Sequence, residues 1–350
     1  MRRVLNLGHR EISDSSSCYV IAEIGHNHQG SLEKCKDLIQ AAVEAGADAV
    51  KLQKRNNRNL FTREMYNSPY NSENAFGSTY GEHREFLEFG KLEYLELKTF
   101  CHNLRVDFFS TAFDFESADF LEELDIPYFK IASGDLRNLP LIEYVARFGK
   151  PIFISTGGAD FEDVQRVYDR IMPINSNICI MQCTSGYPCE YNELNLRVIE
   201  TYRKEFPDVV VGFSSHDSGI ASPVAGYVLG ARVIEKHFTL NRTWKGTDHA
   251  FSLGPQGFRK MVRDIRRVEQ ALGDGIKRCY QSEENPHYKM AKKIVAGRNL
   301  PIGHIISFED LKFKSPADGV PPYRVNEFLG KKTLVALNED DSVNFDVVEI

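Results

Sequence analysis

Residues 209–238 read VVVGFSSHDSGIASPVAGYVLGARVIEKHF, and this stretch decides the fold. Two runs rich in β-branched residues, at 209–216 and 231–238, flank a segment with helical spacing at 221–230. A strand, a helix and a second strand in this order predict a βαβ unit with parallel strands. Each run ends in polar residues, including His216 and His237.

The same alternation runs along most of the chain. Further helical patterns lie at 139–149 and at 31–46, where Ser31 is placed to cap the helix and Gly46 to end it. Eight units in roughly 260 residues predict a (β/α)₈ TIM barrel, assigned to residues 1–278, with a doubly wound open sheet as the alternative. The six other strand-like runs are 18–25, 47–53, 106–113, 128–134, 151–158 and 178–185.

Composition narrows the class of protein. A net charge of −6 gives no general attraction to nucleic acid or to an anionic membrane. No apolar run approaches the roughly 20 residues that a membrane span needs, and the first residues lack a signal-peptide core. The seven cysteines form no C-x-x-C motif, which predicts reduced thiols in a cytoplasmic protein. Cys179 and Cys183 are interpreted as packing residues rather than metal ligands.

Polar residues end all eight predicted strands. In a TIM barrel these ends meet at one rim, where catalytic groups lie. One polar residue at a strand end often only solvates a loop, but eight such ends on one rim predict a site. The residues are Glu23, Lys51, Gln53, Ser110, Thr111, Lys130, Ser133, Ser155, Thr156, Thr184, Ser185, Ser214, Ser215, His216, Glu235, Lys236 and His237.

Within this rim, Lys51 and Lys130 supply positive charge and neighbouring hydroxyl groups supply donors. Lysines combined with such donors typically bind phosphate or carboxylate, so an anionic substrate is expected. The alternative is that each lysine only pairs with a glutamate of the barrel. The hydroxyl groups belong to Thr111, Ser133, Ser155, Ser214 and Ser215.

His216 and His237 end adjacent strands, so both imidazoles could reach one divalent cation. Such a site leaves positions open for water and substrate, and its metal would polarise a carbonyl group. The alternatives are that both are hydrogen-bonded core histidines, or that His26 and His28 form the metal pair instead.

Eight motifs together resemble the sialic acid synthase family from about residue 18 to the end of the chain. The resemblance implies a TIM barrel that condenses phosphoenolpyruvate with an N-acylated hexosamine, or its 6-phosphate, to a nonulosonic acid with release of phosphate. It also implies a divalent metal, most often Mn²⁺, with Mg²⁺ or Co²⁺ as alternatives. The motifs are AEIGHNHQG (22–30), AVKLQK (49–54), FKIASGD (129–135), ISTGG (154–158), QCTSGYP (182–188), GFSSHDSG (212–219), IEKHFT (234–239) and WKGTDH (244–249).

The resemblance assigns roles to residues. It implies that His216 and His237 hold the metal and that Glu23 lies beside both the metal and phosphoenolpyruvate, where it stabilises a cationic centre or orients water. The residues implied to hold phosphoenolpyruvate are Lys51, Thr111, Lys130, Ser133, Ser155, Ser214 and Ser215, and those implied to contact the sugar are Gln53, Tyr187 and Asp248.

The acceptor sugar is suggested by Ser185, where bacterial enzymes that use the free sugar tend to have asparagine. This residue, residues 69–86 and the WKGTDH motif look closer to the animal-type 9-phosphate synthases. N-acetylmannosamine 6-phosphate is therefore the expected acceptor, and a basic cluster after the second strand could bind its phosphate. The alternative is a solvated loop whose bases pair with Glu64, Glu73, Glu82 and Glu85. The cluster is Lys54, Arg55, Arg58, Arg63, His83 and Arg84.

The C-terminal part changes character. Residues 279–289 are interpreted as a linker, and 290–350 resemble the antifreeze-like (SAF) domain, a small clip of short strands. In the family this domain covers the partner's barrel in a domain-swapped homodimer and supplies an arginine. Here Lys314, Ser315 and Pro316 stand at the usual arginine-proline-glycine turn, so Lys314 or Arg324 would have to substitute.

Other functions remain open at this point. A related enzyme could make legionaminate, pseudaminate or a deaminated nonulosonate (Kdn), or could use unphosphorylated N-acetylmannosamine. A non-catalytic sugar-binding protein is a third class. The complete set of Glu23, Lys51, Lys130, His216 and His237 argues against that class, because a binder does not need a metal centre.

Overall fold

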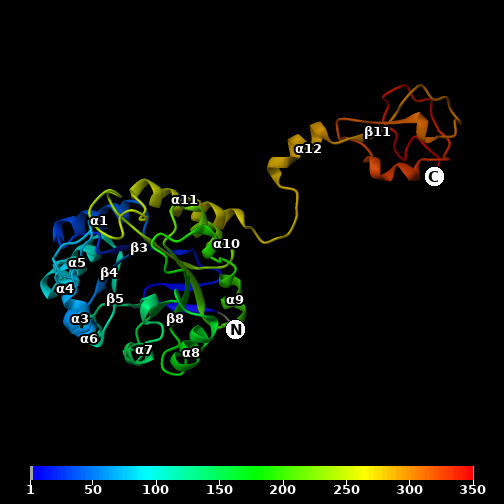
Figure 1. Ribbon diagram of the computed structural model, residues 1–350. Helices are drawn as coiled ribbons and strands as arrows, with labels where there is room; N and C mark the ends of the chain where they lie inside the picture. Colours follow the sequence, from blue (N-terminus) through cyan, green and yellow to red (C-terminus); the bar gives the residue numbers. More distant parts are fainter. Residues whose placement is uncertain (1–2, 350) are drawn as a thin grey trace. The chain divides into compact units, whose positions relative to one another are not determined.

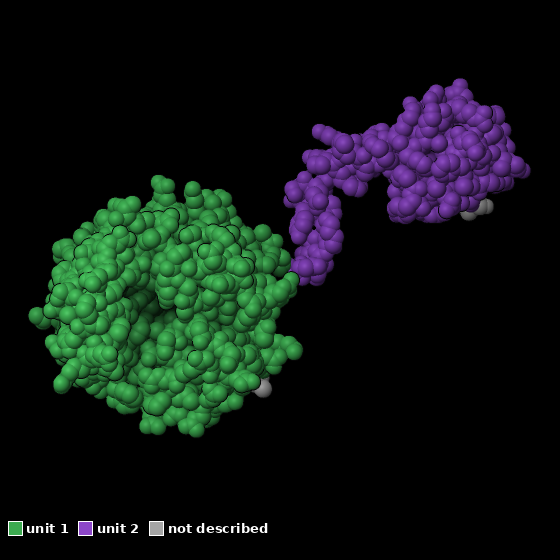
Figure 2. Space-filling view, in the orientation of Figure 1, with its two compact units in different colours: residues 1–273 green, residues 274–350 purple. Residues whose placement is uncertain are grey.

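A computed structural model describes residues 3–349, and the chain divides into two compact units, 1–273 and 274–350 (Figure 2). The sequence interpretation ended the barrel domain at residue 278, five residues beyond this boundary. Helix α12 (Glu284–Met290) occupies the second half of the segment interpreted as a linker. Each unit has its own hydrophobic core.

The first unit is a closed barrel of parallel strands with helices around it, as Figure 1 shows, so the TIM-barrel prediction is confirmed. β10 pairs with β3 and thereby closes the ring. The strands are β3 (Tyr19–Gly25), β4 (Ala49–Lys54), β5 (Asp107–Ala112), β6 (Phe129–Ile131), β7 (Ile152–Ser155), β8 (Ile178–Cys183), β9 (Val210–Ser215) and β10 (Val233–His237).

The helices of the barrel follow the predicted pattern. Ser31 caps α1 by accepting a hydrogen bond from the Lys34 amide at 3.3 Å, and Gly46 follows the helix with φ +95°, a backbone conformation that favours glycine. The main helices are α1 (Leu32–Glu44), α5 (Lys91–Leu104), α6 (Phe115–Glu123), α7 (Leu139–Ala146), α8 (Phe161–Ile171), α9 (Val198–Glu205), α10 (Ala221–Val228) and α11 (Pro255–Ala271). Three short helices follow β4, namely α2 (Asn57–Leu60), α3 (Arg63–Asn67) and α4 (Tyr80–Phe86).

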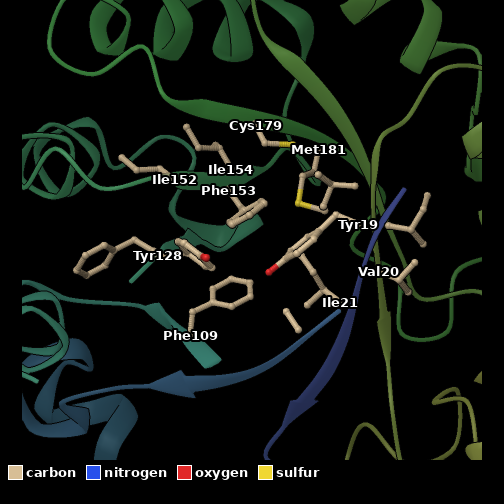
Figure 3. Packing of buried hydrophobic residues seen from close by; sticks show 14 of the residues in the cluster. Tyr19, Val20, Ile21, Phe109, Tyr128, Ile152, Phe153, Ile154, Cys179 and Met181 are labelled. Atoms are coloured by element: carbon tan, nitrogen blue, oxygen red, sulfur yellow. The ribbon is translucent and has the colours of Figure 1, made fainter. Parts of the chain in front are cut away.

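Aromatic side chains fill the interior of the barrel. Figure 3 shows Tyr19, Phe109, Tyr128 and Phe153 pointing toward one another. They come from β3, β5, the residue before β6, and β7. The rings of Phe109 and Phe153 lie 5.2 Å apart, and all four side chains are buried. This packed layer fills the barrel interior, so a substrate cavity is expected between it and the C-terminal ends of the strands.

Two features of this unit were not predicted. A hairpin of β1 (Val4–Asn6) and β2 (Glu11–Ser13) precedes the barrel. Several strands also end earlier than expected, so that residues at their tips lie in loops. Ser133, for example, begins a turn of 3₁₀-helix at Ser133–Asp135 instead of extending β6.

Besides α12, the second unit contains an antiparallel pair, β11 (Lys293–Ala296) with β12 (Leu311–Lys314), together with short 3₁₀ turns and isolated bridges. Its buried residues include Ile294 and Phe328. Both basic residues considered as sugar contacts are paired inside this unit, Lys314 with Asp340 and Arg324 with Glu327. Within residues 3–349, no helix is long and apolar enough to cross a membrane.

Candidate active site

A cavity of about 800 Å³ opens at the C-terminal ends of the barrel strands. Of the described residues around it, five are basic and three are carboxylic acids, although the chain as a whole carries a net charge of −6. The cavity is therefore locally electropositive. The predicted site residues that line it are Glu23, Lys51, Gln53, Thr111, Lys130, Ser133, Ser155, Ser185, Tyr187, Ser214, His216, His237 and Asp248.

Ser215 is the exception, and its predicted contact with phosphoenolpyruvate needs correction. Successive side chains of a strand point to opposite faces, so Ser214 and Ser215 cannot both face the barrel interior. Ser214 lines the cavity, whereas Ser215 accepts a hydrogen bond from Lys236 outside it, at 3.1 Å. Ser110 and Thr156, two further strand-tip residues, also bond away from the cavity.

Two lysines and two glutamates form a buried network in the cavity floor. Lys51 Nζ lies 2.7 Å from Glu23 Oε2 and 3.8 Å from Glu235 Oε1. Lys130 Nζ lies 3.9 Å from Glu235 Oε1 and donates to Ser155 Oγ at 2.6 Å. All four charged side chains are at most 5% exposed. The lysines therefore do pair with barrel glutamates, as the alternative interpretation held, but they also face the cavity.

The environment shifts the pKa values of Glu23 and Glu235 in opposite directions. Burial raises the pKa of Glu23 to about 7 against the opposing effect of Lys51, and the charge of Glu235 adds to the rise. Burial also disfavours the charged form of Glu235, but Lys130 and Lys51 outweigh it and keep that pKa below its usual range. A carboxyl group that titrates near neutral pH inside a cavity is suited to proton transfer.

Hydroxyl groups and a backbone amide line the part of the cavity next to Lys130. Ser133 Oγ accepts a hydrogen bond from the Gly157 amide at 3.0 Å. A Cβ atom added to Gly157 would lie 2.1 Å from Ser185 Oγ, so a larger residue would displace the hydroxyl groups of these serines. The ISTGG motif thus brings backbone and hydroxyl groups close together beside Lys130, which is a suitable environment for an anion.

The imidazole rings of His216 and His237 lie next to each other in the cavity wall. Their ring centroids lie 5.2 Å apart. His216 Nδ1 lies 2.9 Å from the Thr184 carbonyl oxygen, which can only accept, so Nδ1 carries a proton and Nε2 keeps its lone pair. Burial lowers the pKa of each histidine to about 4, so both are neutral at pH 7.

These histidines fit a divalent metal by the chemistry of their donors. Neutral imidazole is the form that binds metals, and the buried His237 Nδ1 has no hydrogen-bond partner. Within residues 3–349, no group of three or more histidine, cysteine or acidic side chains is arranged as a metal site. The two imidazoles can serve as ligands and leave other positions to water and substrate, and the Asp248 carboxylate lies 3.6 Å from His237 Nδ1.

The competing pair, His26 and His28, is less suited to a cation. Guanidinium groups contact both ring nitrogens of His26, with Arg55 at 3.3 Å and Arg84 at 3.5 Å. His28 is buried against the ring of Phe89, 4.1 Å between centroids. A metal at His26 would face two fixed positive charges against one carboxylate, that of Glu88, which lies 3.6 Å from Nε2.

The basic cluster after β4 divides into two groups. Arg55 and Arg84 line the cavity, and neither forms an ion pair with a carboxylate in the described part of the chain. Burial and the charge of Arg84 lower the pKa of Arg55 to about 10. The other members are engaged elsewhere: Lys54 pairs with Glu88, Arg58 lies over Tyr66, Arg63 is exposed, and His83 is buried and accepts from the Phe76 amide.

Among the charged residues that line the cavity, two received no role from the sequence. Glu235 was recognised at a strand tip, but its position between Lys51 and Lys130 depends on strand register. Arg137 lines the cavity from the turn after β6, where nothing in the local sequence signals a site, and it is also paired with Asp163 at 2.6 Å.

Comparison with known proteins places this cavity in a family. A model of the NeuB family matches residues 38–277, and one of the SAF domain matches residues 293–349. The human N-acetylneuraminate-9-phosphate synthase is 40% identical over 341 residues, which cover 97% of this chain and 95% of the human protein. The N,N'-diacetyllegionaminic acid synthase of Campylobacter jejuni is 36% identical over 332 residues, which cover 93% and 98% of the two chains.

Solved structures agree. The crystal structure of N-acetylneuraminic acid synthetase from Leptospira borgpetersenii superposes with a TM-score of 0.72 at 30% identity, covering 82% of this chain and 95% of that one. The family model alone spans more than half of the sequence. The chain therefore belongs to the NeuB family of phosphoenolpyruvate-dependent nonulosonic acid synthases and carries a C-terminal SAF domain.

Proposed function

We propose that this enzyme condenses phosphoenolpyruvate with N-acetylmannosamine 6-phosphate and releases a 9-phosphorylated nonulosonic acid and inorganic phosphate. The observation that carries the reaction is the cavity floor, where Lys51 and Lys130 lie buried beside Glu23 and within the same cavity as two neutral imidazoles. The observation that favours a phosphorylated acceptor is the pair of guanidinium groups at Arg55 and Arg84.

The anionic substrate is assigned to the cavity floor at Lys51 and Lys130 and to the adjoining region of Ser133, Ser155 and Gly157. Ammonium groups in a buried cavity bind phosphate and carboxylate strongly because water screens them little. Bound there, phosphoenolpyruvate would place its C2 and C3 atoms toward His216 and His237. A divalent cation held by these two imidazoles, Mn²⁺ in our proposal, would polarise the carbonyl group of the sugar.

Carbon–carbon bond formation joins C3 of phosphoenolpyruvate to the aldehyde carbon, breaks the C2=C3 double bond and leaves positive charge at C2, while the aldehyde oxygen takes up a proton and becomes a hydroxyl group. Water then adds at C2 and loses one proton. The C2 hydroxyl group loses its remaining proton and becomes the keto oxygen as phosphate leaves with cleavage of the C–O bond, so the two protons of water balance those taken up by the aldehyde oxygen and by the departing phosphate. Glu23 in its carboxylate form can stabilise the charge at C2 and accept the proton from water. Gln53 donates to Glu23 Oε1 at 2.7 Å and thus fixes the orientation of that carboxyl group.

The direct test is phosphate release from phosphoenolpyruvate and Mn²⁺ with a panel of acceptor sugars. The panel contains N-acetylmannosamine, its 6-phosphate, and the precursors of legionaminate, pseudaminate and Kdn. We expect the highest kcat/KM with N-acetylmannosamine 6-phosphate. Release with none of the sugars would contradict the reaction, and preference for another sugar would contradict only the acceptor.

Lys130→Met is expected to weaken phosphoenolpyruvate binding by at least about tenfold and to leave the KM for the sugar nearly unchanged. A charge-assisted contact to phosphate contributes about 1.5–3 kcal/mol, and about 1.4 kcal/mol corresponds to a factor of ten. The KM values for both substrates measure the effect. Lys150→Met, which removes a lysine paired with Glu122 outside the cavity, is the matched control. Equal weakening for both substrates would indicate that Lys130 is only structural.

Arg84→Leu is expected to lower kcat/KM for N-acetylmannosamine 6-phosphate by at least about tenfold, because a phosphate loses a charge-assisted partner. The unphosphorylated sugar has no charge to lose, so its kcat/KM should change by less than about threefold. The control is Arg58→Leu, on the same loop but stacked on Tyr66 at 4.1 Å, outside the cavity. An equal loss with both sugars would remove this assignment.

A further inference from the structure

Behind the two histidines, on the outer face of the barrel, lies a buried ion pair that the proposed mechanism does not use. Lys236 Nζ lies 2.8 Å from Asp217 Oδ1 and contacts the carbonyl oxygen of the same residue. Lys236 is 1% exposed and Asp217 is fully buried. Ser222, on α10, donates to the second carboxylate oxygen of Asp217 at 2.6 Å.

The position of this pair follows from strand alternation. Lys236 precedes His237 in β10, so these two side chains point to opposite faces of the strand, and Lys236 points to the same face as its partner Ser215. Asp217 lies in the loop after β9, one residue beyond His216. Neither Lys236 nor Asp217 is among the described residues that line the cavity. The ion pair therefore lies outside the cavity to which the substrates are assigned.

The backbone ladder ends where this pair begins. β9 and β10 are in register from Val233 with Gly212 to Lys236 with Ser215, and His216 lies beyond the last pair. His237 continues to pair with Glu23 on the other side, in β3. On the side of β9, the Lys236 ammonium group donates hydrogen bonds to Ser215 Oγ and to the backbone carbonyl and one carboxylate oxygen of Asp217. These side-chain bonds connect the two segments beyond the last backbone pair of β9 and β10.

We propose that Lys236 is a positioning residue, which clamps the loop carrying His216 to the strand carrying His237 and so fixes the separation of the two imidazoles. This inference rests on the proposed role of the histidines as metal ligands. A buried ion pair contributes little net stability compared with an apolar replacement, because both charges are removed from water. Its directional bonds instead fix geometry, which is what a site with only two protein ligands requires.

The test compares the wild type with Lys236→Met combined with Asp217→Asn, which removes both charges and leaves no unpaired buried ion. We expect the double variant to fold and its dissociation constant for Mn²⁺, measured by electron paramagnetic resonance, to rise at least about tenfold. In a crystal structure of the metal-free double variant, the separation of the two rings should depart from 5.2 Å, or His216 should occupy more than one position.

Ser222→Ala is the matched control, because it removes one hydrogen bond to Asp217 and leaves the Lys236 contacts in place. It should lower the melting temperature without changing Mn²⁺ affinity. An unchanged imidazole separation in the double variant would overturn the clamp, whether or not metal binds. If the wild type binds no Mn²⁺ but the double variant shows displaced histidines, the clamp stands and the metal assignment fails.

If the double variant does not fold, Lys236→Arg provides the second measurement. Arginine keeps the charge but spreads it over a planar fork, so the single-point contacts of the ammonium group cannot be reproduced. We expect a folded protein with weakened Mn²⁺ binding. Wild-type affinity in Lys236→Arg would contradict the proposal.

Discussion

Replacing either His216 or His237 with alanine is expected to remove bound Mn²⁺ and to lower turnover by at least about a hundredfold, while the barrel stays folded. The protein offers two imidazoles to the cation, 5.2 Å apart between ring centroids, and losing one leaves a single protein ligand. Metal content of the purified variants, Mn²⁺ titration and phosphate release measure the effect, and circular dichroism checks the fold.

His249→Ala is the control for this experiment. His249 is 1% exposed, as deeply buried as the pair, but it contacts Thr239 at 2.7 Å and does not line the cavity. Metal content and turnover of this variant should stay near those of the wild type. Full metal occupancy in both His216→Ala and His237→Ala would show that the cation binds elsewhere.

The barrel could be predicted from the sequence because its signal is local and repeated. Each parallel strand is buried on both faces, so its sequence is a short run of apolar residues. A segment with helical spacing follows each strand. The rim could be predicted for the same reason, since strand ends must meet at one edge. It was harder to predict whether each strand residue faces the cavity or the surrounding helices, because a shift of one position moves a side chain from one face to the other. Ser215 was therefore assigned to the wrong side.

The loops could not be resolved in the same way. Arg55 and Arg84 were named together with Lys54, Arg58, Arg63 and His83, and only the folded loop distinguishes cavity residues from those that pair with Glu88 or lie over Tyr66. Arg137 was missed because a turn after a three-residue strand has no periodicity. The Lys236–Asp217 pair joins residues 19 positions apart, and its contacts depend on the register of two strands.

Glu23→Gln is expected to lower kcat by at least about a hundredfold with little change in the KM for the sugar, because proton transfer by a positioned side chain contributes about 10²–10⁴ to the rate. Glutamine preserves the size of the side chain and can still accept from Gln53, but it cannot take a proton or stabilise positive charge at C2. Steady-state kinetics with both substrates measure the change.

The pH dependence of the wild type tests the same role independently. Burial raises the pKa of Glu23 to about 7, so the group is mostly protonated below that pH and mostly a carboxylate above it. If the carboxylate is the active form, kcat/KM for phosphoenolpyruvate should rise as pH increases through about 7, since this parameter reports groups of the free enzyme. This rise of kcat/KM with pH, the acidic limb of the profile, should vanish in Glu23→Gln. It should persist in the control Glu88→Gln, which alters a buried carboxylate that pairs with Lys54 outside the cavity. A limb of the same position in Glu23→Gln would assign the titration to another group and leave Glu23 as the ion-pair partner of Lys51, whose Nζ lies 2.7 Å from it.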